Sequence, residues 1–197
     1  MIAAISLMRR QDGIDLNRFR RHWLDTHGPL VRAFPGLRRY AQCHVIDSVA
    51  SNEAGLSMRI DGFPILYFDT DEDRTRAHRS PEMAACNVDS RLFVGAVSRV
   101  IAEVEGGLRT GGGRFSLIEI WPEGVTPAPR PVLYRVREQG AAPNSVIPHL
   151  PVTVGAVTQT WYDSLVDLES GAASLGDAVS ARFVVEEHWL ADRKSVV

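Results

Sequence analysis

The chain of 197 residues is long enough for one large domain or for two domains of about 100 residues each. Its apolar fraction of 45% and charged fraction of 23% are typical of a folded globular protein, which excludes the disordered, collagen-like and membrane-embedded classes. A formal net charge of -2 leaves no basic excess to neutralise phosphates, so we expect no nucleic-acid partner.

The N-terminal stretch and the cysteine content bear on the cellular compartment. No apolar run reaches the ~20 residues that span a bilayer, and in MIAAISLMRR the arginines follow the apolar residues, the reverse of a signal peptide. Cys43 and Cys86 lack the CxxC spacing of zinc and redox sites, and we interpret them as buried reduced thiols. We therefore expect a cytoplasmic protein that contacts no membrane.

The first half of the sequence alternates between strand and helix patterns. The expected strands are residues 1–10, 37–46, 63–70 and 94–104, and the expected helices are residues 15–34 and 72–92, the second interrupted near Ser80-Pro81. This β-α-β-β-α-β order is ferredoxin-like, a four-stranded antiparallel sheet with both helices on one face. It predicts an α+β unit over residues 1–105, whose bare sheet face needs a partner.

A glycine-rich connector at residues 106–113 precedes a second series of elements in residues 114–197. The expected strands are residues 115–121, 131–137, 151–162 and 182–190, with a helix-compatible stretch at 164–180. Where a first helix should lie, only proline-rich segments occur. We interpret this half as a degenerate second ferredoxin-like unit.

The stretch FRRHWLDTHGPLV, residues 19–31, joins a helical apolar stripe to a Gly-Pro step. Pro29 lacks an N–H and its ring clashes with the carbonyl of Asp25, so the helix should kink or restart near residues 26–28. At ~100° per residue His27 lies about 80° to one side of the stripe and His22 about 60° to the other. His27 therefore either hydrogen-bonds the carbonyls released at the break or reaches a cleft as a general acid/base.

Several of these residues together resemble a known family. The pattern F-x-x-H-W-x-x-x-H-x-P-L...P-G...Y of the EthD family, named for a protein linked to ethyl tert-butyl ether degradation, is matched by Phe19, His22-Trp23, His27, Pro29-Leu30, Pro35-Gly36 and Tyr40. The resemblance covers residues 1–105, and residues 114–197 lack its elements. It implies a dimeric α/β barrel, in which two ferredoxin-like sheets enclose a shared interior. The second half could supply the second sheet, giving a monomeric pseudo-dimer, and a homodimer is the alternative.

Candidate site residues come from the motif and from the strand that follows it. Tyr40, Gln42 and His44 share the polar face of residues 37–46, and that face lines either a cavity or the solvent. If it lines the cavity, Tyr40 and His44 would form a second proton donor or acceptor pair opposite His27. We take His27, Tyr40 and His44 as candidate catalytic residues.

The candidate substrate-binding residues are His22, Arg38 and Gln42. For His22 the alternative is packing or capping at the border of the helix. For Arg38 and its neighbour Arg39, the choice is between binding an anionic substrate group and remaining solvated surface arginines. The six histidines show no HExxH spacing, and no phosphate-binding glycine loop follows a strand, so we expect no metal and no cofactor.

The resemblance implies more than one activity, because relatives include a muconolactone methylisomerase, fungal dehydratases and, in the wider barrel superfamily, cofactor-free monooxygenases. We expect a small, partly apolar organic molecule bound in the barrel cavity and cofactor-independent acid/base chemistry of the isomerase, cyclase or dehydratase type. A cofactor-free oxygenase or oxidoreductase is one alternative. A non-catalytic binding or assembly module is the other, and it leaves open whether the chain is an enzyme.

Overall fold

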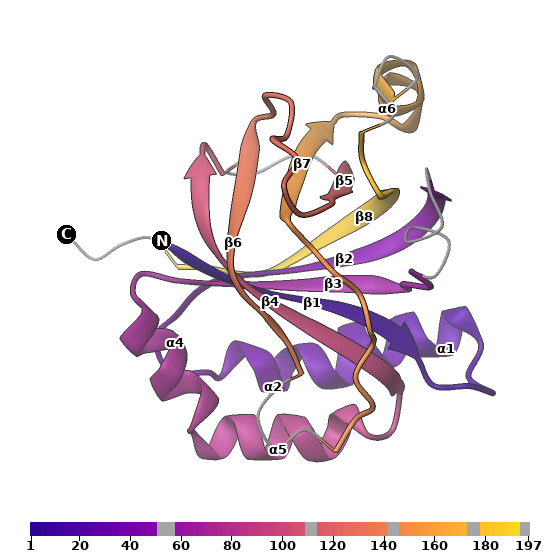
Figure 1. Ribbon diagram of the computed structural model, residues 1–197. Helices are drawn as coiled ribbons and strands as arrows, with labels where there is room; N and C mark the ends of the chain where they lie inside the picture. Colours follow the sequence, from indigo (N-terminus) through magenta and orange to yellow (C-terminus); the bar gives the residue numbers. More distant parts are fainter. Residues whose placement is uncertain (51–57, 109–113, 142–145, 173–177, 194–197) are drawn as a thin grey trace.

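The computed structural model describes residues 1–50, 58–108, 114–141, 146–172 and 178–193. Within these ranges eight antiparallel strands close into one barrel (Figure 1). The strands are β1 (Ile2–Arg10), β2 (Leu37–Ala50), β3 (Gly62–Phe68), β4 (Val94–Gly106), β5 (Phe115–Trp121), β6 (Val132–Gly140), β7 (Ala156–Tyr162) and β8 (Ala181–Asp192).

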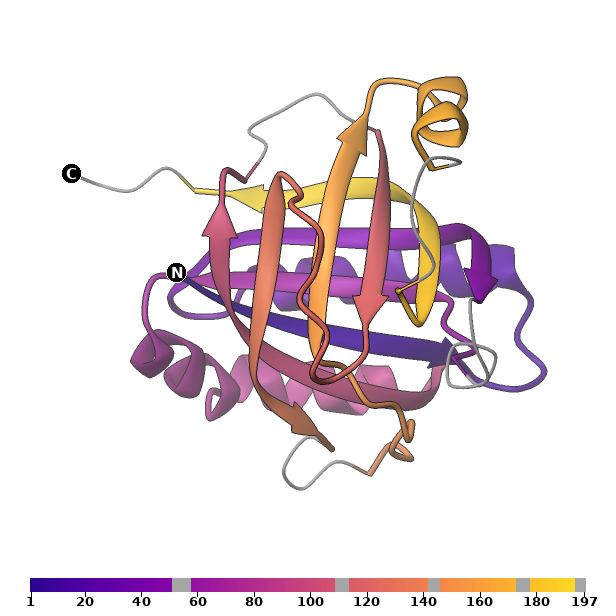
Figure 2. The ribbon, with the colours of Figure 1, turned by 45° about the horizontal axis from the view of Figure 1, so that its top comes forward.

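The order of the strands around the barrel, β1-β3-β2-β8-β5-β7-β6-β4, contains the same four-stranded sheet twice. The first half reads β4-β1-β3-β2 and the second half reads β8-β5-β7-β6, so each strand of one half has a counterpart in the other. Two seams join the halves, β2 with β8 and β4 with β6 (Figure 2). The fold is therefore the expected one, two tandem ferredoxin-like sheets in an α/β barrel closed within one chain.

Helices cover the outer face of the first sheet (Figure 1). They are α1 (Leu16–Arg21), the π-helix η1 (His22–His27), α2 (Gly28–Arg32), α4 (Asp71–His78) and α5 (Pro81–Ser90), and α6 (Leu165–Ala172) lies beside β5 and β7 in the second half. Thr70 and Ser80 cap α4 and α5, because their hydroxyls accept from the N–H groups of Asp73 and Met83. None of the helices in the described part of the chain is long and apolar enough to cross a membrane.

The ends of some strands differ from those expected from the sequence. β2 extends to Ala50 instead of ending at residue 46, and β7 begins at Ala156, not at residue 151. The expected helix 72–92 is interrupted at the predicted place, because Ser80 caps a new helix there. The chain between β5 and β6 contains no helix, as expected for the degenerate second half. The expected connector lies partly outside the described residues, so the domain boundaries stay a prediction.

The barrel interior is a packed core with a polar network at one place. Apolar side chains from both halves fill it, including Ile5 and Ile65 from the first and Ile118 and Phe183 from the second. The buried Glu187 of β8 accepts hydrogen bonds from Ser116 Oγ at 2.9 Å, Trp161 Nε1 at 2.9 Å, Trp189 Nε1 at 3.1 Å and also Gln159 Nε2. The network of hydrogen bonds continues from Gln159 to Tyr134 and then to Tyr67 of the first half.

A substitution at Gly62 tests how tightly the helices pack on the first sheet. A Cβ built there would meet the Trp23 ring, with Cη2 at 2.7 Å, so Gly62→Ala should lower the free energy of unfolding by about 1–3 kcal/mol. Gly107→Ala is the matched control, because its Cβ meets nothing within 4 Å. Urea unfolding of the two variants checks this expectation, and equal stabilities would contradict the packing.

Candidate functional site

The helix that carries the motif changes its hydrogen-bonding ladder at residues 22–27. Here the backbone hydrogen bonds join residues five apart, as in the bond from the N–H of Gly28 to the carbonyl of Trp23. Gly28 keeps helical angles, φ -54° and ψ -47°, so the helix continues directly into α2. The break expected near residues 26–28 is a widened turn instead of an end, and it lets the helix pass Pro29.

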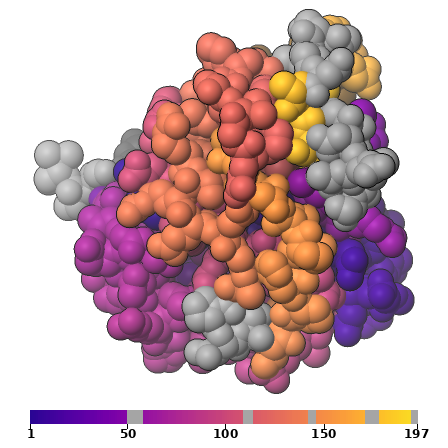
Figure 3. Space-filling view, in the orientation of Figure 1, coloured from indigo at the N-terminus to yellow at the C-terminus, as the bar shows by residue number. Residues whose placement is uncertain are grey.

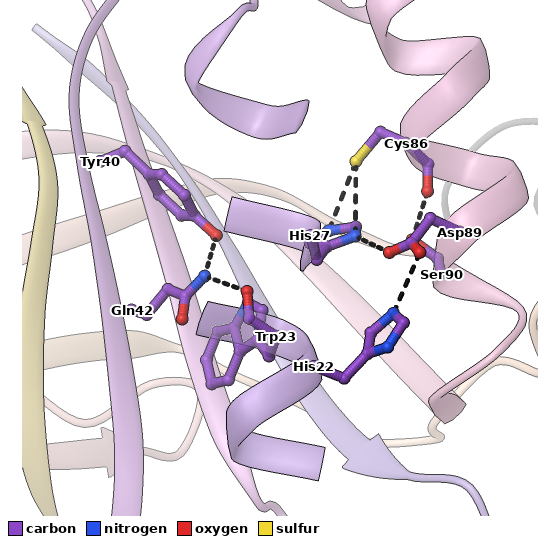
Figure 4. Close-up of polar contacts among 8 residues, drawn as sticks. All are labelled: His22, Trp23, His27, Tyr40, Gln42, Cys86, Asp89 and Ser90. Atoms are coloured by element: carbon purple, nitrogen blue, oxygen red, sulfur yellow. Dashed lines mark hydrogen bonds and ion pairs between the residues drawn. The ribbon is translucent and has the colours of Figure 1, made fainter. Parts of the chain in front are cut away.

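The widened turn decides where the two motif histidines point. On an α-helix, residues five apart lie on different sides. In a π-helix, whose hydrogen bonds join residues five apart, they lie on nearly the same side. His22 and His27 accordingly hold one carboxylate, that of Asp89 on α5 (Figure 4). His27 Nδ1 lies 2.8 Å from Asp89 Oδ2, and His22 Nε2 lies 3.0 Å from Asp89 Oδ1.

A cavity of about 150 Å³ lies beside His27, between the outer face of the first sheet and the helices. Its walls include Ser6 and Leu66 from the sheet, Val31 from α2 and Cys86 from α5. Ile147 of the second half is a further wall, because the backbone at residues 148–150 is hydrogen-bonded to Val97 of β4. His27 and its cavity lie on the helix side of the barrel wall, and the expected binding of a ligand in the barrel interior stays a prediction.

The protonation of His27 follows from its neighbours. Because carboxylate oxygens only accept, Asp89 holds the proton on Nδ1 and leaves Nε2 as the basic nitrogen. Burial lowers the pKa of His27, while the hydrogen bond and the charge of Asp89 act in the opposite direction. His27 is therefore neutral near pH 7, with Asp89 positioned to stabilise the imidazolium.

The other neighbour of His27 is a thiol. Cys86 Sγ lies 3.3 Å from His27 Nε2, and burial, followed by the charge of Asp89, raises the pKa of this thiol to about 12. The thiol is thus protonated and donates a weak hydrogen bond to Nε2. A ligand hydroxyl or an acidic C–H group can displace this bond at small cost, so Nε2 can accept a proton in the cavity.

Tyr40, Gln42 and His44, on the polar face of β2, are buried against the helices. None of the three lines the cavity beside His27. Gln42 Nε2 donates to the carbonyl of Trp23 and to Tyr40 Oη, both at 2.8 Å, and His44 Nε2 lies 3.0 Å from Gln42 Oε1 (Figure 4 shows Tyr40, Gln42 and Trp23). Gln42 thus satisfies the carbonyl at the widened turn, the role that one interpretation gave to His27. The structure does not bring Tyr40 or His44 together with His27.

Burial makes Tyr40 and His44 poor proton carriers. It raises the pKa of the Tyr40 phenol well above its usual range, and it lowers the pKa of His44 to about 3, with His188 and Arg20 as further causes. His44 stacks on the indole of Trp23 with ring centroids 4.5 Å apart. Both residues therefore support the helix layer, and the expected second proton-transfer pair has no geometric support.

Arg38 and Arg39 are engaged in ion pairs away from the cavity. Arg38 Nε lies 2.5 Å from Asp69 Oδ2, and Arg39 Nε lies 2.9 Å from Asp192 Oδ1. Neither lines the cavity beside His27. Of the expected substrate-binding residues, His22 contacts the site through Asp89, Gln42 holds the helix backbone, and Arg38 lies elsewhere.

Sequence reasoning missed Asp89 and gave Cys86 no role in the site. One signal was present, because Cys86, Asp89 and Ser90 have the spacing that places residues on one face of a helix. Nothing in the sequence linked that face to His27, which is 62 residues earlier than Asp89. Among the described residues no group of three metal-ligating side chains is close enough to hold a metal ion.

The family of the first half follows from a comparison with family models. Residues 11–96 match the model of the EthD domain, a range that contains His22, His27, Cys86 and Asp89. This match identifies residues 11–96 as an EthD domain. A comparison with curated proteins finds no match.

Solved structures similar to this chain fall into two groups. An EthD family protein from Bacillus halodurans C-125 is 27% identical, covering 52% of this chain and 97% of its own, with a TM-score of 0.44. An anthrone oxidase-like protein, 9% identical, and a putative monooxygenase from Lactobacillus acidophilus NCFM, 8% identical, each cover 100% of this chain, with TM-scores of 0.60 and 0.54. The two matches also span 96% and 98% of these other chains, so the likeness of fold extends over both sheets of the barrel.

Asp89→Asn should lower the pKa of His27 further, because it removes the charge that opposes the effect of burial. Titration of the His27 ring protons by NMR measures this change. Asp25→Asn is the control, an exposed carboxylate on the same helix. An unchanged or raised pKa of His27 in Asp89→Asn would show that the ion pair does not govern this imidazole.

His44 should make the fold acid-sensitive. Its pKa of about 3 in the folded state lies below the ordinary value of 6.5, so the unfolded chain binds the proton first and stability falls as the pH drops below about 6.5. The loss should reach about 2 kcal/mol by pH 5, before most carboxylates titrate. Urea unfolding from pH 7 to 5 measures it, and His44→Phe, which keeps a ring on Trp23, should flatten the slope. An equal slope in that variant would exclude His44 as the cause.

Proposed function

We propose that the cavity beside His27 binds a small, partly apolar organic molecule and that His27 moves a proton on it without a cofactor. The observation that carries this proposal is the arrangement of one imidazole, with Nδ1 on Asp89 and the ring beside a mostly apolar cavity. This is the arrangement of a general base, because the second nitrogen is oriented and its protonated form is stabilised.

The chemistry follows from the two states of His27. Neutral Nε2 accepts a proton from a carbon or hydroxyl of the ligand, and Asp89 stabilises the imidazolium that results. The same Nε2–H then returns the proton to another atom of the ligand, which gives an isomerisation, or to a leaving hydroxyl, which gives a dehydration. Each route begins and ends with neutral His27, so proton and charge balance over the cycle.

The size of the cavity limits the ligand. A volume of about 150 Å³ is that of cavities known to take up benzene, so the part of the ligand beside His27 is no larger than a single ring. Val31, Leu66 and Met83 give this space an apolar lining. Candidate ligands are therefore small cyclic ketones, lactones and phenols.

His27→Gln should reduce proton transfer by about 10² or more, the usual effect of removing a general acid/base. NMR can follow deuterium incorporation from D₂O into a panel of six-membered cyclic ketones and unsaturated five-membered lactones. His149→Gln is the matched control, because His149 does not line the cavity. A ligand that binds and exchanges equally in both variants would contradict the role of His27. Binding with no exchange in the unmodified chain would favour the non-catalytic binding module.

A second candidate is a cofactor-free oxidase or oxygenase. It is supported by the barrels of the anthrone oxidase-like protein and the putative monooxygenase, a likeness of fold alone. In the same cavity His27 would deprotonate an electron-rich phenol that then reacts with O₂. An oxygen electrode with an electron-rich phenol of one ring as the substrate distinguishes the two, because an isomerase or dehydratase consumes no oxygen.

A further inference from the structure

A second, more open pocket adjoins the cavity beside His27. It has a volume of about 740 Å³ and lies between α4, β4 and the end of β6. Figure 3 shows this face, where the purple surface of α4 adjoins the orange surface of β6. His78, Asn87 and Arg99 line both spaces, so these three side chains lie at the border between the apolar cavity and the polar pocket.

Arg99 is half-buried where the two spaces meet. Its Nη1 lies 3.2 Å from His78 Nδ1, and among the described residues no carboxylate lies within ion-pair distance of it. Burial, followed by the charge of Arg74, lowers the pKa of Arg99, and only Glu138 acts in the opposite direction. A guanidinium withdrawn from water in this way lacks a counter-ion that would stabilise it.

His78, which lines the same two spaces, carries a second N–H group. A guanidinium has no acceptor, so His78 Nδ1 accepts from Arg99 and the imidazole is neutral with its proton on Nε2. Burial and the charge of Arg99 lower the pKa of His78, in agreement with this neutral form. No acceptor among the described residues is hydrogen-bonded to Nε2, so this N–H is free to donate to a ligand.

The other charges around the pocket favour an anion. Arg74 is held by Asp71, with Nε to Oδ1 at 2.7 Å and Nη2 to Oδ2 at 3.2 Å. Arg79 lies on the rim, and Glu138 is the one acidic residue among the described lining. Positive charge therefore exceeds negative charge at the mouth of the cavity.

We propose that Arg99 and His78 bind the carboxylate of a small ring compound whose apolar ring occupies the cavity beside His27. The inference rests on the proposed function, and it narrows the substrate class to monocarboxylates with a body of one ring. The flat fork of a guanidinium pairs with the two coplanar oxygens of a carboxylate, and His78 Nε2 supplies a further donor. An anchored carboxylate fixes one end of the ligand, so the ring presents a defined edge to His27.

The test compares benzoate with benzamide, which has the same ring but no charge. Isothermal titration of the full chain should give a Kd for benzoate about tenfold lower than for benzamide, the scale of a hydrogen bond to a charged group. Arg99→Gln should remove this preference and leave benzamide binding unchanged within about twofold. Arg91→Gln, an exposed arginine at the end of α5 that lines neither space, should keep the preference.

Equal affinities for the two probes, or a benzoate preference that survives in Arg99→Gln, would overturn the carboxylate site. Arg99→Lys keeps the charge without the fork and should retain part of the preference, provided that its circular dichroism shows a folded chain. Because these readouts measure binding alone, they are independent of proton transfer. Loss of exchange in His27→Gln together with no preference for benzoate would uphold the proposed function and reject this inference.

Discussion

The pairing of β2 with β8 and of β4 with β6 is the constraint on which the rest of the structure depends. A ferredoxin-like sheet has helices on one face only, and its other apolar face must be covered. The two seams cover it with a second sheet from the same chain, and the buried hydrogen bonds from Glu187 to Tyr67 cross the interior between the halves. Apolar side chains and this network pack the described part of the interior, and the cavity beside His27 lies outside the barrel wall, under the helices.

The site depends in turn on one carbonyl, that of Trp23. It accepts from the N–H of Gly28 along the widened turn and from Gln42 Nε2 on the sheet, so it fixes the rotation of the helix relative to β2. That rotation brings both motif histidines to Asp89. Gly28 allows the close approach, because a Cβ there would lie 2.9 Å from Leu190 Cδ1 on β8. The second half thus shapes the site of the first.

Much of the fold could be predicted from the sequence, because strands and helices differ in the period of their apolar residues. The site could be predicted only in part. A wheel drawn at ~100° per residue separates His22 from His27, and only the π-helix, which no residue pattern indicated, brings them together. Alternation showed that Tyr40 and His44 share a face but could not show which way it points. Asp89, Arg99 and Ile147 come from distant segments, and contacts between distant segments leave no periodic signal.

The tethering of the two sheets has a consequence for how the barrel survives dilution. A barrel built from two separate chains exists in proportion to protein concentration, because each sheet must find a partner by collision. Here the partner sheet is always present at the effective concentration set by a short connection, and its association is unimolecular. The second half is then free to lose a helix and the histidine motif, as long as its strands still close the barrel. One half could diverge as a scaffold while the other kept its chemistry.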